Sequence, residues 1–154
     1  MKLAIICIGR IKEDYIKTGI GEYITRIKRY SPIDVIEIKE ETGTIPLPKA
    51  LEKEVKGVLK NLKQGDFVVA LGDKGTHYTS NKFAEFINKL SSTGKRRICF
   101  IVGGAYGLHP SIAEGADLVL SLSSMTFPHE LARLILLEQI YRAFTILRNE
   151  PYSH

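Results

Sequence analysis

The chain has 154 residues, of which 44% are hydrophobic and 25% are charged, a composition typical of one globular domain spanning residues 1–154. Lysine and arginine (22) exceed aspartate and glutamate (17), and the net charge of +5 permits a nucleic-acid partner without requiring one. The first apolar run, from Leu3 to Gly9, is too short for a signal core or a membrane span, so we expect a cytoplasmic protein with no membrane partner.

Short apolar runs alternate with helical patterns along the chain. In chain order we expect a strand at Lys2–Gly9, a helix within Glu13–Tyr30, a strand at Asp34–Lys39, a loop at Thr42–Pro48, a helix at Lys49–Leu62, a strand at Phe67–Leu71, a helix at Ser80–Leu90 capped by Ser80, a strand at Ile98–Val102, a helical turn at Pro110–Glu114, a strand at Leu118–Leu122 and a helix at Glu130–Arg148. This alternation predicts an α/β fold, with a mostly parallel sheet and helices on both faces.

Glycines or small residues follow three of the predicted strands. These segments are Gly72–Gly75, Gly103–Gly107 and Ser123–Phe127. In open parallel sheets, ligands bind beyond the carboxyl ends of the strands, and glycine lets the backbone approach a ligand closely. A single glycine cluster is more often a tight turn, but three clusters at three carboxyl ends favour a shared pocket.

Several common site motifs are missing. The segment GGAYG does not match the dinucleotide-binding pattern GxGxxG, and the phosphate-binding loop GxxxxGK[ST] is absent. The histidines His77, His109, His129 and His154 are scattered without metal-ligand spacing, so we expect no metal. Cys7 and Cys99 each lie inside an apolar run and are interpreted as buried free thiols.

The last predicted helix is apolar over most of its circumference. One narrow polar stripe is formed by Glu138, Arg142, Thr145 and Asn149. Burial on almost all sides predicts a homodimer that packs helix against helix, with burial inside one subunit as the alternative. Arg133 falls among the apolar positions, where an unpaired charge would cost several kcal/mol. It therefore needs a carboxylate or backbone partner, unless it faces a ligand.

Four segments carry a resemblance to a known family: VGGAYGLHP, LSLSSMTFPHELAR, EQIYRAF and the terminal PYSH. Over essentially its whole length the sequence resembles the ribosomal RNA large subunit methyltransferase H family, the smallest SPOUT enzymes. The resemblance implies a C-terminal trefoil knot, an obligate homodimer and S-adenosylmethionine as the cofactor. It also implies methylation of N3 of a pseudouridine in 23S rRNA, in a loop at the subunit interface of the assembled ribosome.

The resemblance also implies which residues form the site. The cofactor-binding residues would be Leu71, Gly72, Gly103, Gly104, Leu122, Ser123, Ser124, Met125, Thr126 and Phe127. The catalytic candidates are His129, Arg142, Tyr152 and His154, with Arg133 and Glu138 as further candidates. One departure stands out, because Ser153 occupies the position where family members commonly carry a tail histidine.

Basic residues that could grip RNA phosphates include Arg26, Lys28, Arg29, Lys95, Arg96, Arg97 and Arg148, although for any single one of them a solvated surface is the simpler interpretation. Two rival functions remain at this point. One is a SPOUT methyltransferase that acts on tRNA. The other is a non-catalytic factor that binds the ribosome. Binding of S-adenosylmethionine would separate the second from an enzyme.

Overall fold

A five-stranded parallel sheet in the order β2-β1-β4-β3-β5 organises residues 1–152, the part of the chain that the computed structural model describes. The strands are β1 (Lys2–Ile8), β2 (Ile33–Ile38), β3 (Asp66–His77), β4 (Arg97–Val102) and β5 (Leu118–Ser121). The helices are α1 (Asp14–Ile27), α2 (Leu47–Asn61), α3 (Ser80–Ser92), α4 (Pro110–Gly115) and α5 (His129–Leu147). The predicted alternation of strands and helices, and the parallel sheet, are confirmed.

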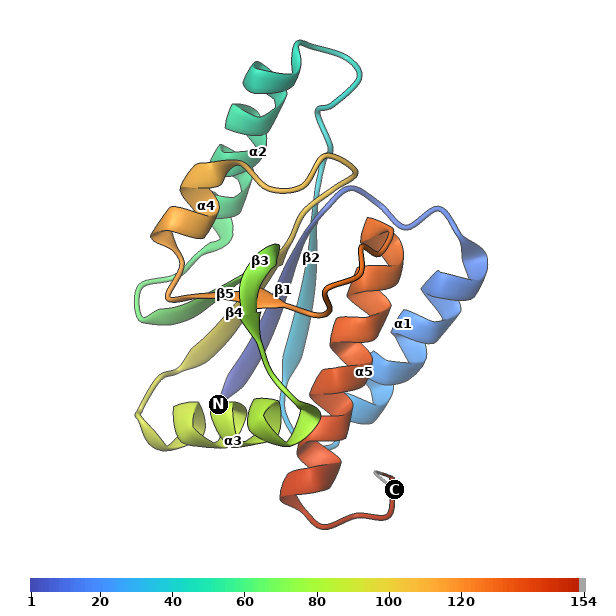
Figure 1. Cartoon of the computed structure of the whole chain (residues 1–154), viewed down its shortest axis with the longest axis vertical. Coiled ribbons are helices and arrows are strands. Elements are labelled where there is room, and N and C mark those ends of the chain that lie inside the picture. Colours follow the sequence, from blue (N-terminus) through green and yellow to red (C-terminus); the bar gives the residue numbers. More distant parts are fainter. Residues whose placement is uncertain (153–154) are drawn as a thin grey trace.

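Helices cover both faces of the sheet because the central strands are apolar on both sides. In β1, Leu3 and Ile5 belong to one hydrophobic cluster, which the helices α1, α3 and α5 share. Ala4 and Ile6 belong to a second cluster with residues of α2 and α4. Figure 1 shows α5 alongside α1 on one face, with α2 and α4 grouped together away from them. The amino-terminal end of α5 therefore lies at the carboxyl edge of the sheet, because the helix runs antiparallel to the strands.

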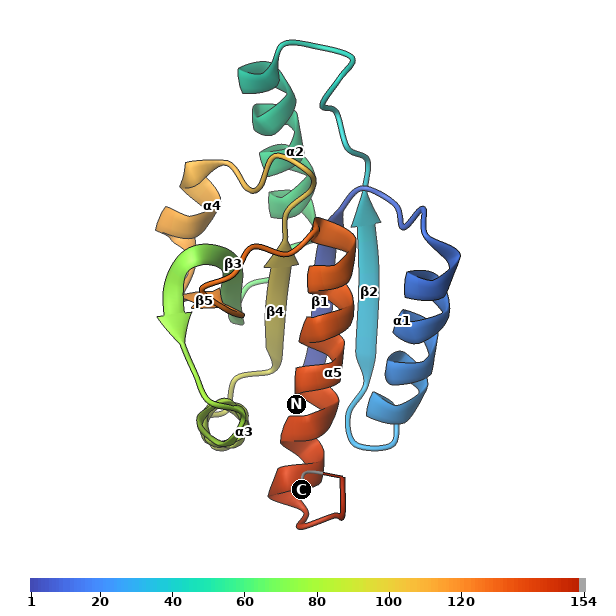
Figure 2. The same ribbon diagram turned by 45° about the vertical axis from the view of Figure 1, so that its right-hand side comes forward.

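Strand β3 is longer than predicted and does not end at Leu71. It continues through the glycine segment to His77, and its pairing with β5 shifts register, since both Leu71 and Thr76 face Leu120. Figure 2 shows the far half of β3 curling over β5. A Cβ on Gly75 would lie 2.6 Å from the carbonyl oxygen of Val119, so this glycine permits the two backbones to approach. The glycines after Leu71 thus lie inside β3, at a shift of its register against β5, and not beyond the carboxyl end of the strand as predicted.

Two helix starts also differ from the prediction. Helix α2 begins at Leu47, inside the predicted loop Thr42–Pro48. Its first turn includes a proline, whose missing N–H costs nothing there because the first N–H groups of a helix have no intrahelical acceptor. Helix α3 is capped by Thr79, whose hydroxyl accepts from the Lys82 N–H at 3.2 Å. The predicted cap Ser80 instead donates to Gln139 Oε1 at 2.8 Å, and this contact joins α3 to α5.

A buried ion pair closes the amino edge of the sheet. The guanidinium of Arg97 donates from Nε to Asp66 Oδ1 at 2.8 Å and from NH2 to the Asn61 carbonyl at 3.1 Å. Burial alone would raise the pKa of Asp66, but the Arg97 hydrogen bonds hold it below its usual value. Arg97 is 4% exposed, so its interpretation as an RNA-contacting residue is wrong.

Candidate functional site at the carboxyl edge of the sheet

A cleft of about 1040 Å³ opens at the carboxyl edge of the sheet. Its walls come from residues 71–74 inside β3, from the ends of β4 and β5 and the loops that follow them, and from the first turn of α5. This is where an open parallel sheet places its ligands, and the volume is that of a site for a cofactor-sized molecule. The three segments singled out in the sequence therefore meet at one cleft, although the first of them lies inside β3 and not at its end.

Nearly all of the predicted cofactor residues line this cleft. The lining includes Leu71, Gly72, Gly103, Gly104, Leu122, Ser123, Met125, Thr126 and Phe127. Ser124 is not part of the lining, although both of its neighbours are. The structure thus brings together residues from positions 71 to 127, and Pro128 and His129 extend the same wall into α5.

The loop after β4 folds into a tight turn that its glycines make possible. The Gly107 N–H donates to the Gly104 carbonyl at 3.1 Å, and Gly107 has a φ of +75°, which favours glycine. A Cβ on Gly103 would lie 2.7 Å from the carbonyl carbon of Gly107. The expected reason for these glycines was space for a ligand. At Gly103 the nearest atoms to that Cβ belong to the turn's own backbone, so the glycine first allows the turn to close.

The loop after β5 is held by short local hydrogen bonds. Ser121 Oγ donates to the Ser123 carbonyl at 2.9 Å, and the Met125 N–H donates to Ser123 Oγ at 3.0 Å. Such bonds satisfy the backbone where no strand or helix does so. Met125 is 76% exposed, and Tyr106 in the loop after β4 is 65% exposed. Both residues line the cleft, so two large side chains that still face solvent flank its opening.

Arg133 fastens α5 to the end of β1. It is 2% exposed, and its NH2 group donates to the carbonyls of Ile8 and Gly9 at 2.6 and 2.7 Å. Its NH1 group lies 3.5 Å from Glu37 Oε1 on β2. The predicted backbone partner is therefore present, together with a carboxylate, and Arg133 is not among the residues that line the cleft.

Glu130 makes a second connection from the same turn, which the sequence did not suggest. Its Oε1 accepts from the Lys12 N–H at 2.5 Å and from the Glu13 N–H at 3.2 Å. Burial by itself would raise the pKa of Glu130, but these two amides bring it below its ordinary value. The first turn of α5 thus holds the loop between β1 and α1 at both ends, beside the cleft.

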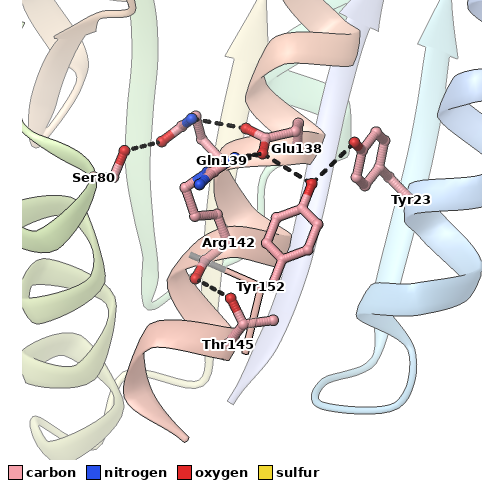
Figure 3. Close-up of polar contacts among 7 residues, drawn as sticks. All are labelled: Tyr23, Ser80, Glu138, Gln139, Arg142, Thr145 and Tyr152. Atoms are coloured by element: carbon pink, nitrogen blue, oxygen red, sulfur yellow. Dashed lines mark hydrogen bonds and ion pairs between the residues drawn. The ribbon is translucent and has the colours of Figure 1, made fainter. Parts of the chain in front are cut away.

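The catalytic candidates fall into two groups. His129 is half-buried and lines the cleft. Arg142 lies thirteen positions further along α5, about 20 Å away at the helical rise of 1.5 Å per residue. Tyr152 contacts the middle of α5, near Glu138 and Arg142 (Figure 3), so the structure does not bring it to the cleft of its own chain. His154 lies outside the described residues.

The tail residue Tyr152 belongs to a polar cluster on the outer side of α5. Its hydroxyl donates to Glu138 Oε1 at 3.1 Å and lies 3.2 Å from the Tyr23 hydroxyl. Arg142 donates to the same Glu138 oxygen at 2.9 and 2.7 Å and lies 4.9 Å from the centre of the Tyr152 ring. Burial, followed by the Tyr23 hydrogen bond, raises the pKa of Tyr152 well above its usual value. Tyr152 is thus a neutral donor at physiological pH and not a base.

The predicted polar stripe on α5 is only partly correct. Thr145 is fully buried and donates to the Arg142 carbonyl at 2.8 Å, and Asn149 lies beyond the helix with a φ of 54°. Phe144 stacks on Tyr30 with ring centroids 5.3 Å apart, so part of the apolar circumference packs within the same chain. The alternative of burial inside one subunit is correct for that part.

The outward face of α5 combines apolar and polar residues. At helical spacing it carries Leu131, Ile135, Glu138 and Arg142. Leu131 and Ile135 are half-buried and belong to neither hydrophobic cluster. Within residues 1–152 Glu138 and Arg142 already contact Tyr152, whereas Leu131 and Ile135 remain outside both hydrophobic clusters.

Other chemistry finds little support in the described part of the chain. Cys7 and Cys99 are buried as predicted, and burial raises the pKa of each thiol to about 12, so neither is an activated nucleophile. Within residues 1–152 no three histidine, cysteine, aspartate or glutamate side chains gather as metal ligands would. Over the same residues, no helix has the length and apolarity needed to cross a membrane.

Comparison with known proteins identifies the family to which this α/β chain belongs. A family profile described as "Predicted SPOUT methyltransferase" matches residues 1–154. A relative from Methanococcus maripaludis is 48% identical and the match covers 99% of each chain. Relatives from Alkaliphilus oremlandii (45% identical, 99% of each chain) and Desulforamulus reducens (43%, 99% of this chain and 98% of the relative) are both named "Ribosomal RNA large subunit methyltransferase H". The chain belongs to the ribosomal RNA large subunit methyltransferase H family.

Solved structures with the same fold are more distant in sequence. The tRNA (m1G37) methyltransferase of Aquifex aeolicus has a TM-score of 0.59 at 18% identity, covering all of this chain and 75% of that one. A probable methyltransferase from Bordetella pertussis has a TM-score of 0.57 at 12% identity, covering 92% and 95%. At these identities the likeness concerns the fold alone.

Proposed function

We propose that this protein is an S-adenosylmethionine-dependent methyltransferase that modifies N3 of a pseudouridine in 23S rRNA, in the cytoplasm, with the assembled ribosome as its substrate. Residues 1–154 would form a single SPOUT domain with a trefoil knot. Family membership supports the reaction class. The observation that supports the site is one cleft formed by residues 71–74 of β3 and the ends of β4 and β5, which nine of the ten residues expected to bind the cofactor line.

The cleft fits S-adenosylmethionine in size and in chemistry. Its volume of about 1040 Å³ exceeds that of most small-molecule sites, which leaves room for a target base beside the cofactor. Its wall includes Gly103–Gly107 and, from the loop after β5, Leu122, Ser123, Met125, Thr126 and Phe127; backbone N–H and C=O groups of such loops can pair with the edge of an adenine. When bound, the cofactor supplies an activated methyl group on a sulfonium, so the protein needs no nucleophile of its own.

The side chains then have to position the base and accept the N3 proton. His129 is the candidate that lies in the cleft, at the first position of α5. Arg142 and Tyr152 are held as a pair on Glu138, and Arg142 lies about three and a half turns along α5 from His129. We therefore assign them to the cleft of a second subunit, together with the tail that follows them.

The homodimer that this requires can be described from the outward stripe of α5. If two copies of α5 cross antiparallel near Ile135, the apolar residues Leu131 and Ile135 of both subunits meet around the two-fold axis. The part of α5 that carries Glu138 and contacts Tyr152 in one subunit then lies opposite the start of α5, with His129 and Ala132, in the other subunit. Such a dimer covers the half-exposed apolar residues of α5 and completes each cleft with the partner's tail.

Replacing Ile135 by aspartate is expected to dissociate the dimer, because two uncompensated carboxylates would face each other at the two-fold axis. The monomer should stay folded, since Ile135 belongs to neither hydrophobic cluster. Light scattering measures the mass, and thermal unfolding checks the fold. Leu59→Asp is the matched control, because Leu59 is 57% exposed on α2, on the other face of the sheet. An Ile135→Asp protein that keeps the dimer mass would exclude this packing.

Incubation with methyl-labelled S-adenosylmethionine tests the reaction and its substrate together. Assembled ribosomes should be labelled, whereas protein-free 23S rRNA and tRNA should not, because a net charge of only +5 per chain offers few phosphate contacts for gripping naked RNA. Digestion and mass spectrometry should then locate the methyl group on N3 of a pseudouridine. Labelling of tRNA would support the rival substrate, and ribosome binding without any cofactor affinity would support a non-catalytic factor.

A further inference from the structure

We infer that Glu40 is a positioning residue of the methyltransferase site: it latches the glycine turn after β4 to the carboxyl edge of the sheet and so sets the cofactor affinity of the cleft. This inference rests on the proposed function. The carboxylate Oε1 of Glu40 accepts a hydrogen bond from the Ala105 N–H at 3.1 Å, across 65 residues of sequence. Ala105 lies in the turn that forms one wall of the cleft.

The Glu40 side chain crosses the end of a neighbouring strand to reach that turn. Glu40 follows β2, and in the sheet β1 lies between β2 and β4. Two glycines leave the space that this side chain occupies. A Cβ on Gly9 would lie 3.1 Å from Glu40 Oε2, and a Cβ on Gly104 would lie 2.6 Å from Oε1. One carboxylate thus fits between glycines at the ends of β1 and β4, and any side chain at Gly104 would displace it.

The backbone on both sides of the Glu40 contact is held in place. The N–H of Glu41, the next residue, donates to Glu54 Oε1 at 3.0 Å, and Glu54 is 3% exposed on α2. On the other side, Arg133 holds the Gly9 carbonyl from α5 at 2.7 Å. The segment that carries Glu40 and the strand end that it crosses are therefore both anchored in the core. Within the described residues, Glu40 makes no ion pair that would draw its carboxylate away from the turn.

A latch of this kind acts on ligand binding through the shape of the wall. Without it, the Ala105 N–H loses its acceptor and the turn keeps only its internal Gly107-to-Gly104 hydrogen bond and the packing of Leu108. The turn would then sample positions that narrow or widen the cleft, and the cofactor would bind only the fraction with the correct wall. The interaction requires an acceptor oxygen at this position and not a negative charge.

The test compares Glu40→Leu with Glu40→Gln, which keeps an oxygen acceptor of the same reach. Affinity for S-adenosylhomocysteine, the stable reaction product, is measured by calorimetry. Glu40→Leu should bind it about tenfold more weakly or worse, the loss expected for one hydrogen bond to a charged group, and Glu40→Gln should stay within about threefold of the unmodified protein. Glu41→Leu is the matched control, because its side chain points to Lys39 at 3.8 Å and does not contact the turn.

Two further readouts separate positioning from general stability. In the ligand-free protein, hydrogen exchange of the Ala105 amide should be faster in Glu40→Leu than in Glu41→Leu, while amides of β1 and β4 are unchanged. Gly104→Ala should weaken S-adenosylhomocysteine binding by displacing the same carboxylate. The loss of affinity in the double variant with Glu40→Leu should therefore be smaller than the product of the two single losses.

Equal affinities and equal Ala105 exchange in Glu40→Leu and Glu41→Leu would overturn the latch. If the unmodified protein fails to bind S-adenosylhomocysteine, the proposed function fails instead, and the exchange measurement still decides whether Glu40 holds the turn.

Discussion

Deleting Tyr152–His154 is expected to lower methyl transfer to the ribosome by at least about a hundredfold, while cofactor binding and the dimer persist. A hundredfold is the low end of what a positioned proton-transfer group contributes. Cofactor binding should survive because none of the cleft-lining residues lies beyond Ala132. Single-turnover rates with saturating ribosomes measure the transfer step, and calorimetry with S-adenosylhomocysteine measures binding. Full activity in the truncated protein would show that proton removal depends on His129 or another group in the cleft.

Mixed dimers then tell whose cleft the tail completes. A tail-deleted subunit with an intact cleft is co-expressed with a Gly103→Val subunit that keeps its tail, and the two are purified through different tags. If the tail acts on the partner's cleft, the mixed dimer contains one complete site and regains up to about half of the normal activity. If the tail acts on its own cleft, each subunit lacks one component and the mixed dimer stays inactive. The position of Tyr152 on Glu138, away from the cleft of its own chain, leads us to expect the first result.

Gly103→Ala should weaken S-adenosylmethionine binding by at least about tenfold, and Gly103→Val should remove measurable binding. The single added methyl group of alanine would already lie 2.7 Å from the Gly107 carbonyl carbon, and backbone cannot move aside as a flexible side chain can. Forcing such contacts costs about 1–3 kcal/mol, and each 1.4 kcal/mol is a factor of ten in affinity.

The matched control for this change is Gly115→Ala. Gly115 ends α4, has nothing within 4 Å of its Cβ position, and does not adopt a positive φ. Its replacement should leave both affinity and thermal unfolding close to those of the unmodified protein. If Gly103→Ala binds the cofactor as tightly as Gly115→Ala does, the turn is not the rigid wall that we describe.

The sequence was sufficient to predict the order of the elements and the edge of the sheet at which the cleft opens. Apolar runs such as FVVAL and ICFIV could only be covered strands, and the carboxyl ends of parallel strands necessarily meet at one edge. The burial of Arg133 among apolar positions on a helix likewise implied a partner. The trefoil knot that we propose could not be derived in this way, because general topology rules disfavour knots and only the family resemblance suggests one.

Contacts between distant parts of the chain were beyond prediction from local patterns. The Arg133 hydrogen bond to Ile8 spans 125 residues, and the Glu40 bond to Ala105 spans 65. Nothing around Glu40 in the run KEETG distinguishes it from a solvated charge. The glycines of β3 were placed beyond the strand end for a related reason, since a glycine at a register shift inside a strand looks the same in the sequence as one that follows the strand.

The two buried thiols lie on opposite sides of the central sheet, and this gives the molecule a built-in pair of unfolding reporters. Cys7 faces the layer of α1, α3 and α5, whereas Cys99, on the neighbouring strand, faces the layer of α2 and α4. We expect a thiol reagent in solution to react with neither while both layers are closed, because each cysteine is at most 1% exposed and burial disfavours its thiolate. The order in which the two become alkylated during slow denaturation therefore reveals which helical layer separates from the sheet first.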